Sequence, residues 1–134
     1  MGLHLSKALL YAIHALHYMH EHGSERPVMV REICEKYSFS YDTVLSVLRR
    51  LSRGKLLTTH RGIKGGFSLR NPLKTISLLT LVETLDGPVE AIDPLQPGFG
   101  NPKLKRAVLK NSSAINESYR KLLKRTSCLK LMGY

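Results

Sequence analysis

Apolar positions in the first part of the chain recur at helical spacing in three separate segments. In residues 6–22 they form one face of a helix that Ser6 can cap and Gly23 can end. That face consists of Leu9, Ile13, Leu16 and Met19. Residues 30–37 and 40–53 predict two further helices separated by a turn over residues 37–40, an arrangement typical of a helix-turn-helix.

The predicted helix over residues 40–53 divides into a buried stripe and an open surface. Its stripe consists of Val44, Val47, Leu48 and Leu51. Ser40 is placed to cap this helix, and Asp42 in the first turn suits the positive end of the helix dipole. The open surface is the part that can enter the major groove of DNA.

Residues 56–70 predict a β-hairpin, because two short apolar strands, about 56–60 and 67–70, flank the sequence RGIKGG. Its glycines permit the positive φ angles of a tight turn, and Arg61 and Lys64 place two cations at the tip. A helix-turn-helix followed by a basic hairpin is a winged helix, a fold that typically binds duplex DNA.

The remainder predicts a helix over residues 76–85, a loop rich in Pro and Gly over 88–102, and a long helix over 103–124. The long helix carries an apolar stripe with heptad-like spacing. The stripe consists of Leu104, Val108, Ile115, Tyr119 and Leu122. It can pack on its own winged helix or on a second copy, and we expect a dimer interface, because dimeric winged-helix proteins read palindromic half-sites.

The pattern therefore predicts a fold that is mainly α with a small β-hairpin: a winged helix-turn-helix with a long C-terminal dimerisation helix. We expect a DNA-binding domain over residues 1–87, the loop over 88–102, and the dimerisation helix with a C-terminal tail over 103–134. At 134 residues the chain suits a single core.

Charge strengthens the interpretation as a DNA-binding protein. The formal net charge is +11, and residues 49–70 contain seven lysines and arginines and no acid. We expect base and phosphate contacts from this helix and hairpin. The candidate DNA-binding residues are Ser40, Tyr41, Asp42, Thr43, Ser46, Arg49, Arg50, Arg53, Lys55, Arg61 and Lys64. The alternative, a solvated basic surface without a partner, is less compatible with the winged-helix pattern.

The sequence favours neither an enzyme nor a membrane protein. The glycines of the hairpin lie between two strands, so they do not form a phosphate-binding loop between strand and helix, and no nucleophile–base pair is evident. No apolar run is long enough to span a membrane, and the N-terminus lacks a signal-peptide pattern. Two cysteines do not make a disulfide framework, so we expect a cytoplasmic protein.

Two groups of residues leave a sensing role open. Cys128 lies beside Lys124, Arg125 and Lys130, and neighbouring cations favour a reactive thiolate; otherwise it is inert. Cys34 is expected to pack as a small hydrophobic residue. The histidines of the first helix recur at steps of three, so two of them can share a metal with Glu21, or they form a polar helix face. They are His14, His17 and His20.

The ordered motifs resemble the Rrf-two family of bacterial winged-helix regulators, the group containing IscR, NsrR and CymR. The resemblance rests on an ordered set of motifs over residues 5–88, which includes Arg61-Gly62, Gly65-Gly66-Phe67 and the segment LVETLDGP over 81–88. The set as a whole is specific, whereas no single motif is. It implies a homodimer that represses or activates promoters, with Arg61 in the minor groove. Its recognition positions fall on Ser40, Asp42, Leu45 and Ser46, and Leu45 replaces a glutamate used in one branch, so a different operator is expected.

The chain departs from this family at the sensor. Cluster-binding members carry three closely spaced cysteines before the long helix, whereas residues 89–127 contain none. We therefore expect a homodimeric, sequence-specific DNA-binding repressor that binds a palindromic operator in double-stranded DNA and has no cofactor. A protein-interaction module, or a redox- or metal-responsive regulator using Cys128 or the histidines, is the alternative. The effector, a protein or a small molecule, is not identified.

Overall fold

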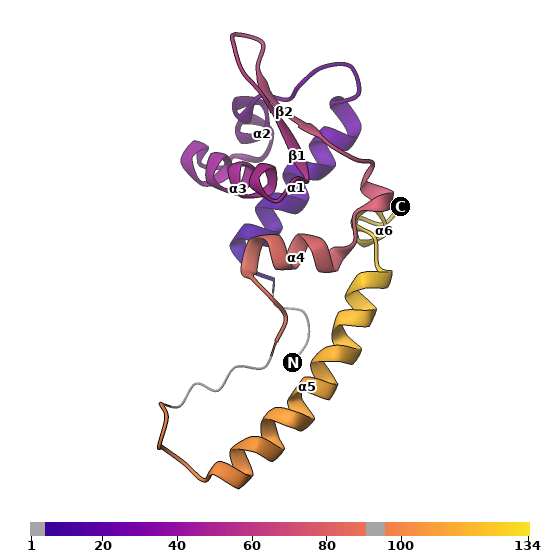
Figure 1. The fold of residues 1–134 in the computed structure, drawn as a ribbon. Coiled ribbons are helices and arrows are strands. Elements are labelled where there is room, and N and C mark those ends of the chain that lie inside the picture. The colour runs from indigo at the N-terminus through magenta and orange to yellow at the C-terminus, as the bar shows by residue number, and fades with distance from the viewer. Residues whose placement is uncertain (1–4, 91–95) are drawn as a thin grey trace.

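The elements follow the order of a winged helix and then a long helix (Figure 1). The computed structural model describes residues 5–90 and 96–134. It contains α1 (Lys7–His22), α2 (Val30–Tyr37), α3 (Tyr41–Arg53), β1 (Leu57–His60), β2 (Gly66–Leu69), the short 3-10 helix η1 (Leu73–Thr75), α4 (Leu78–Asp86), α5 (Pro102–Arg125) and α6 (Cys128–Leu131). The predicted fold, mainly α with a small β-hairpin, is confirmed.

The first three helices pack around a common core, as their apolar stripes predicted. The Ser6 hydroxyl accepts a hydrogen bond from the Leu9 amide at 3.1 Å, which caps α1. On α3, the four stripe residues are all buried, and Gly54 ends the helix. Ser40 has the backbone conformation of an N-cap, but its side chain makes no capping bond to the first turn of α3, so that part of the prediction is wrong.

The hairpin is held to the segment between α1 and α2 by a close approach of backbones. Leu57 pairs with Leu69 and His60 with Gly66, and Val28 forms an isolated bridge with Phe67 through bonds of 2.8 and 2.9 Å. Gly66 has φ +150°, and a Cβ there would lie 2.3 Å from the Val28 carbonyl oxygen. Only glycine fits at position 66, because any side chain there would collide with the backbone of Val28, which pairs with Phe67.

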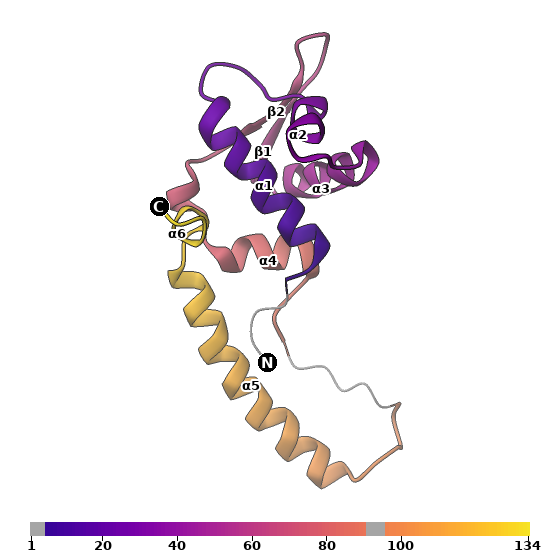
Figure 2. The ribbon, with the colours of Figure 1, turned by 180° about the vertical axis from the view of Figure 1, so that it is seen from behind.

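The long helix α5 projects away from the winged helix, and its last turns pack against α4 (Figures 1 and 2). The contact with α4 includes the buried Leu123 and an ion pair of 3.0 Å between Arg120 and Glu83. The Asn101 side chain caps the start of α5 by accepting from the Leu104 amide at 3.1 Å. Within the predicted loop over 88–102, residues 91–95 lie outside the described part of the chain.

The segment after α5 returns to the core rather than forming a tail. The Leu78 amide donates to the Thr126 carbonyl at 2.7 Å, and the Cys128 amide donates to the Ile76 carbonyl at 2.8 Å. These bonds seat α6 against η1 and α4, beside which the C-terminus lies (Figure 1). In the part of the chain that the structure describes, no helix is long and apolar enough to cross a bilayer.

Candidate nucleic-acid interface

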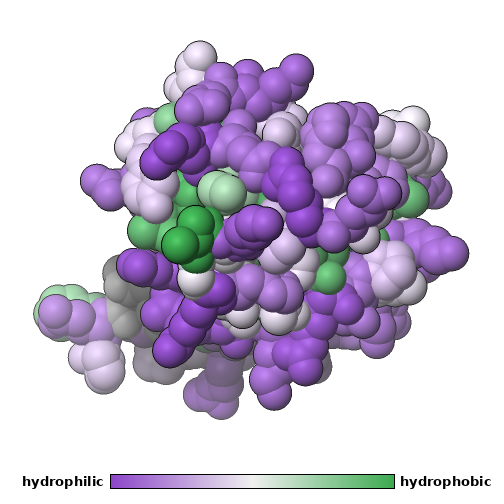
Figure 3. Space-filling view, turned by 90° about the horizontal axis from the view of Figure 1, so that it is seen from above, coloured by the Kyte–Doolittle hydropathy of each residue, from purple (hydrophilic) through white to green (hydrophobic). Residues whose placement is uncertain are grey.

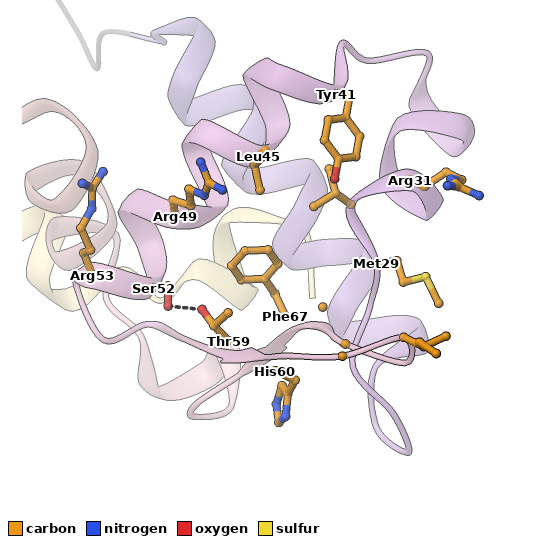
Figure 4. Close-up of a pocket in the computed structure, with 15 residues that line it drawn as sticks. Met29, Arg31, Tyr41, Leu45, Arg49, Ser52, Arg53, Thr59, His60 and Phe67 are labelled. Atoms are coloured by element: carbon orange, nitrogen blue, oxygen red, sulfur yellow. Dashed lines mark hydrogen bonds between the residues drawn. The ribbon is translucent and has the colours of Figure 1, made fainter.

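An open groove of about 800 Å³ runs between α3 and the hairpin (Figure 4). Its walls come from the start of α2, the outer face of α3, and both strands with their connecting turn. The lining residues are Met29, Val30, Arg31, Tyr41, Leu45, Arg49, Ser52, Arg53, Thr59, His60, Gly62, Ile63, Gly65, Gly66 and Phe67. The groove thus joins the two elements that a winged helix uses to contact DNA.

The outer face of α3 points into this groove because its other face is buried. Tyr41, Leu45 and Arg49 are spaced four residues apart, which places them on one face of the helix, and all three line the groove. Figure 4 shows Tyr41 and Leu45 directed toward the hairpin. At the far end of α3, the hydroxyls of Ser52 and Thr59 share a hydrogen bond of 2.7 Å. This bond connects α3 to β1 and fixes the width of the groove at that end.

The start of α2 is held by an ion pair next to the groove. The two terminal nitrogens of Arg26 donate to the Glu32 carboxylate at 2.9 and 2.6 Å. The Arg26 hydrogen bond lowers the pKa of Glu32, and a bond from the Met29 amide at 2.7 Å adds to the effect. This arrangement fixes the first turn of α2, from which Met29 and Arg31 reach the edge of the groove.

The groove is cationic. Arg31, Arg49 and Arg53 line it, and no Asp or Glu is among the fifteen described residues that do so. Seen from above, from the side of the hairpin, the molecule is mostly hydrophilic with a small group of hydrophobic side chains (Figure 3). Cations without opposing acids, set between a recognition helix and a wing, favour contact with the phosphates of a nucleic acid.

The structure brings together some of the residues selected from the sequence and not others. Tyr41, Arg49 and Arg53 line the groove. A second set is exposed but does not line it; these residues are Ser40, Asp42, Thr43, Ser46, Lys55, Arg61 and Lys64. Sequence reasoning missed Met29 and Arg31, because they precede the basic run and reach the groove only through tertiary packing.

Arg50 lies elsewhere than predicted. Its guanidinium donates to the Leu85 carbonyl at 2.8 Å, and its buried Nε has no hydrogen-bond partner among the described residues. Leu85 is in the last turn of α4, where carbonyls lack partners within the helix, so a cation there satisfies one of them. Arg50 was expected to face a phosphate; in the structure its side chain instead joins α3 to α4.

Cys128 also lies in a different environment from the one predicted. It is fully buried, its thiol is 3.8 Å from the Ser77 carbonyl, and burial raises its pKa from 9.0 to about 11. Of the two alternatives for Cys128, its burial favours the inert thiol, because desolvation opposes the charged thiolate. Cys34 is half-buried against the core, as expected for a small hydrophobic residue, and burial raises its pKa too.

The histidines of α1 make contacts within the protein. His14 Nδ1 lies 2.7 Å from the Leu10 carbonyl oxygen, and His17 Nε2 lies 3.3 Å from Glu21 and 3.1 Å from the Tyr134 hydroxyl. The Tyr134 hydroxyl donates to Glu21 at 3.2 Å. Within residues 5–90 and 96–134, no three His, Cys, Asp or Glu side chains form a group that could hold a metal ion.

The sequence and the fold are both similar to those of known transcriptional regulators. A family model described as Rrf2, iron-dependent transcriptional regulator, covers residues 5–133. The HTH-type transcriptional regulator NsrR of Oceanobacillus iheyensis is 27% identical over 84 residues, which make up 63% of this chain and 57% of that relative. The alignment therefore spans little more than half of the relative's length.

Solved structures share the fold at low sequence identity. CymR, the global cysteine regulator of B. subtilis, superposes with a TM-score of 0.70 at 19% identity, over 96% of this chain and 95% of that one. IscR of T. potens superposes with a TM-score of 0.66 at 20% identity, over 98% and 88%. The resemblance inferred from the sequence is confirmed. The family match across nearly the whole chain, together with the winged-helix fold, shows that this protein belongs to the Rrf2 family of transcriptional regulators.

Proposed function

We propose that the protein is a sequence-specific DNA-binding repressor that acts as a homodimer in the cytoplasm. The groove between α3 and the hairpin carries this proposal, since it is lined by arginines and by no described acid. In this arrangement, α3 enters the major groove and Arg61 enters the minor groove at the tip of the hairpin. Bases are read from the exposed surface of α3, from Ser40 to Arg49.

The phosphate contacts come from cations on both walls of the groove and beside it. They are Arg31, Arg49, Arg53, Lys55 and Lys64. Arg50 is left out of this set because its guanidinium is bonded to α4. Binding through such contacts releases counterions and weakens steeply with salt.

The proposed dimer interface is the apolar stripe of α5. Leu104, Val108, Ile115 and Leu122 are all more than half exposed, whereas Tyr119 is half-buried against the core. Packing of the stripe on the same chain is the alternative; among residues 5–90 and 96–134, Tyr119 is the one stripe residue that packs against the core of its own chain. Apolar residues exposed in a row along a helix favour a partner helix.

The dimer is tested by analytical ultracentrifugation of Ile115→Asp, with Ser113→Asp as the matched control on another face of α5. We expect the first variant to sediment as a monomer and the control as a dimer. A wild-type protein that sediments as a monomer contradicts the proposed assembly.

The donors in this chain do not fit a cysteine-ligated iron–sulfur cluster. Such clusters are held by several thiolates. The chain has two cysteines; Cys34 is half-buried on α2, and Cys128 is buried on α6 with a raised pKa. We therefore propose that this regulator responds to an effector other than a cluster held by cysteines. Purification without oxygen, followed by iron and sulfide analysis, should give less than one cluster per dimer.

Selection of bound duplexes from a random pool tests the function itself. A palindromic product supports both the regulator and its two-fold symmetry. A salt titration separates this function from a winged-helix protein-interaction module, because DNA binding weakens steeply with salt and an apolar protein contact does not. No enrichment of any duplex, at low or moderate salt, overturns the proposal.

A further inference from the structure

The tip of the hairpin is a tight turn with an apolar residue at its outermost point. The Gly65 amide donates to the Gly62 carbonyl at 3.0 Å, which closes a four-residue turn with Ile63 and Lys64 at its centre. Gly62 has φ +103°, a conformation that favours glycine. The turn therefore presents the side chain of Ile63 in a defined position.

Ile63 contributes nothing to the core of its own chain. Its side chain is 98% exposed. Among the exposed large hydrophobic residues in the described part of the molecule, the next highest value is 69%, at Ile115. The tip of a hairpin is normally occupied by a polar or charged residue. Here the charged residues, Arg61 and Lys64, lie close to Ile63 in the sequence, and the tip itself is apolar. A fully exposed isoleucine at the end of a hairpin gains free energy when a partner buries it.

The surroundings of Ile63 identify the kind of partner. Ile63 lines the same groove as Arg49 and Arg53 of α3, and it lies between the exposed cations Arg61 and Lys64. The partner must therefore combine a dense row of negative charges with an apolar surface within a few ångströms. A DNA duplex provides both, as phosphates line the grooves and the faces of the bases are apolar once two neighbouring pairs separate.

We propose that Ile63 is a wedge that enters the minor groove and partly unstacks one base step, which bends the duplex toward its major groove. This inference rests on the proposed DNA-binding function and deepens it. Lys64 holds a phosphate beside the opened step, and Arg61 lies in the minor groove next to Ile63. Pyrimidine–purine steps unstack most easily, so the wedge favours a T-A or C-A step at the position of the wing.

The test compares wild type with Ile63→Ala and with Ile63→Leu, which keeps an apolar wedge of the same volume. The probe is a duplex of about 30 base pairs with a central T-A step, labelled at both ends for energy transfer and with 2-aminopurine at the step. Fluorescence anisotropy measures affinity, energy transfer measures the bend, and 2-aminopurine emission reports unstacking. Because Ile63 packs on nothing, all three proteins should fold equally, as checked by circular dichroism.

We expect Ile63→Ala to bind about tenfold more weakly, with a smaller bend and without the rise in 2-aminopurine emission. Its salt dependence should equal that of wild type, because no charge is removed. Ile63→Leu should behave as wild type. Equal affinity, bend and emission for wild type and Ile63→Ala overturn the wedge and leave the DNA-binding function standing. A wild type that does not bind duplex DNA at low salt overturns both.

Discussion

Arg49 and Arg50 are neighbours in the sequence with opposite expected roles, and two alanine variants separate them. Arg49 is exposed and lines the groove, whereas Arg50 is half-buried and bonded to the Leu85 carbonyl at 2.8 Å. Arg49→Ala should therefore change DNA binding and leave stability unchanged. Arg50→Ala should lower stability and leave the salt dependence of DNA binding unchanged.

The size of the first effect follows from counterion release. Each phosphate contact contributes about 0.9 to the slope of log affinity against log salt. Removal of Arg49 from both protomers of a dimer should make the slope less steep by about 1.8. Since Arg50 makes no phosphate contact in this arrangement, Arg50→Ala should shift the slope by less than about 0.5.

The size of the second effect follows from the bond between α3 and α4. A hydrogen bond from a charged group contributes about 1.5–3 kcal/mol, and removal of Arg50 leaves a carbonyl in the last turn of α4 without this partner. Loss of the buried, unpartnered Nε of Arg50 offsets part of this cost. We expect a net loss of about 1.5 kcal/mol, which lowers the Tm by about 5 °C for a chain of this length.

Fluorescence anisotropy with a random-sequence duplex, at several salt concentrations, measures the slope, and thermal unfolding by circular dichroism measures the stability. The duplex need not contain the operator, because the slope reports contacts to phosphate. The reasoning is refuted when Arg50→Ala flattens the slope as much as Arg49→Ala does. It is equally refuted when Arg49→Ala leaves the slope unchanged.

Three other predictions test the core, the wing and the reading of DNA. The pKa of Cys128 is raised to about 11, so its contribution to stability is complete below about pH 9 and is lost between pH 9 and 11. The full loss is about 3 kcal/mol, and urea unfolding at pH 8 and 10.5 should show about 2 kcal/mol of it in wild type but not in Cys128→Ala. Gly66→Ala should lower the free energy of unfolding by more than about 2 kcal/mol, because its Cβ would meet the Val28 carbonyl. Gly62→Ala has open space around its Cβ and should lower it by about 1 kcal/mol, through backbone strain alone. Similar urea midpoints for the two variants would argue against this difference. Arg61→Ala should lose the A·T enrichment beside the wing in duplexes selected from a random pool, and retained enrichment would exclude Arg61 as the minor-groove contact.

Much of the fold could be predicted from the sequence because its elements are local. The stripe of α3 and the cap of α1 depend on spacing along the chain, and both are found where predicted. The segment after α5 could not be predicted in this way. Residues 126–128 are held by backbone bonds to residues 76–78, and such bonds between distant segments leave no periodic pattern in either one.

The candidate site was only partly predictable for the same reason. The basic run over residues 49–70 indicates the region, and the glycines indicate the hairpin. The order of charged residues along the chain does not show, however, in which direction each side chain points. Whether an arginine at the end of α3 faces a phosphate or a neighbouring helix depends on which side of α3 that helix covers.

The sequence by itself determined the winged helix, the basic hairpin and the family, because helical and strand periodicity and glycine positions are local properties. Only the tertiary structure decided the environments of Arg50, Cys128 and Arg31. The first two are covered by α4 and its neighbours, and the packing of α2 on α3 brings the third to the groove. The physical reason is that burial and hydrogen bonding between distant segments set the environment of a side chain, and that environment decides whether a charge or a thiol is available to a partner.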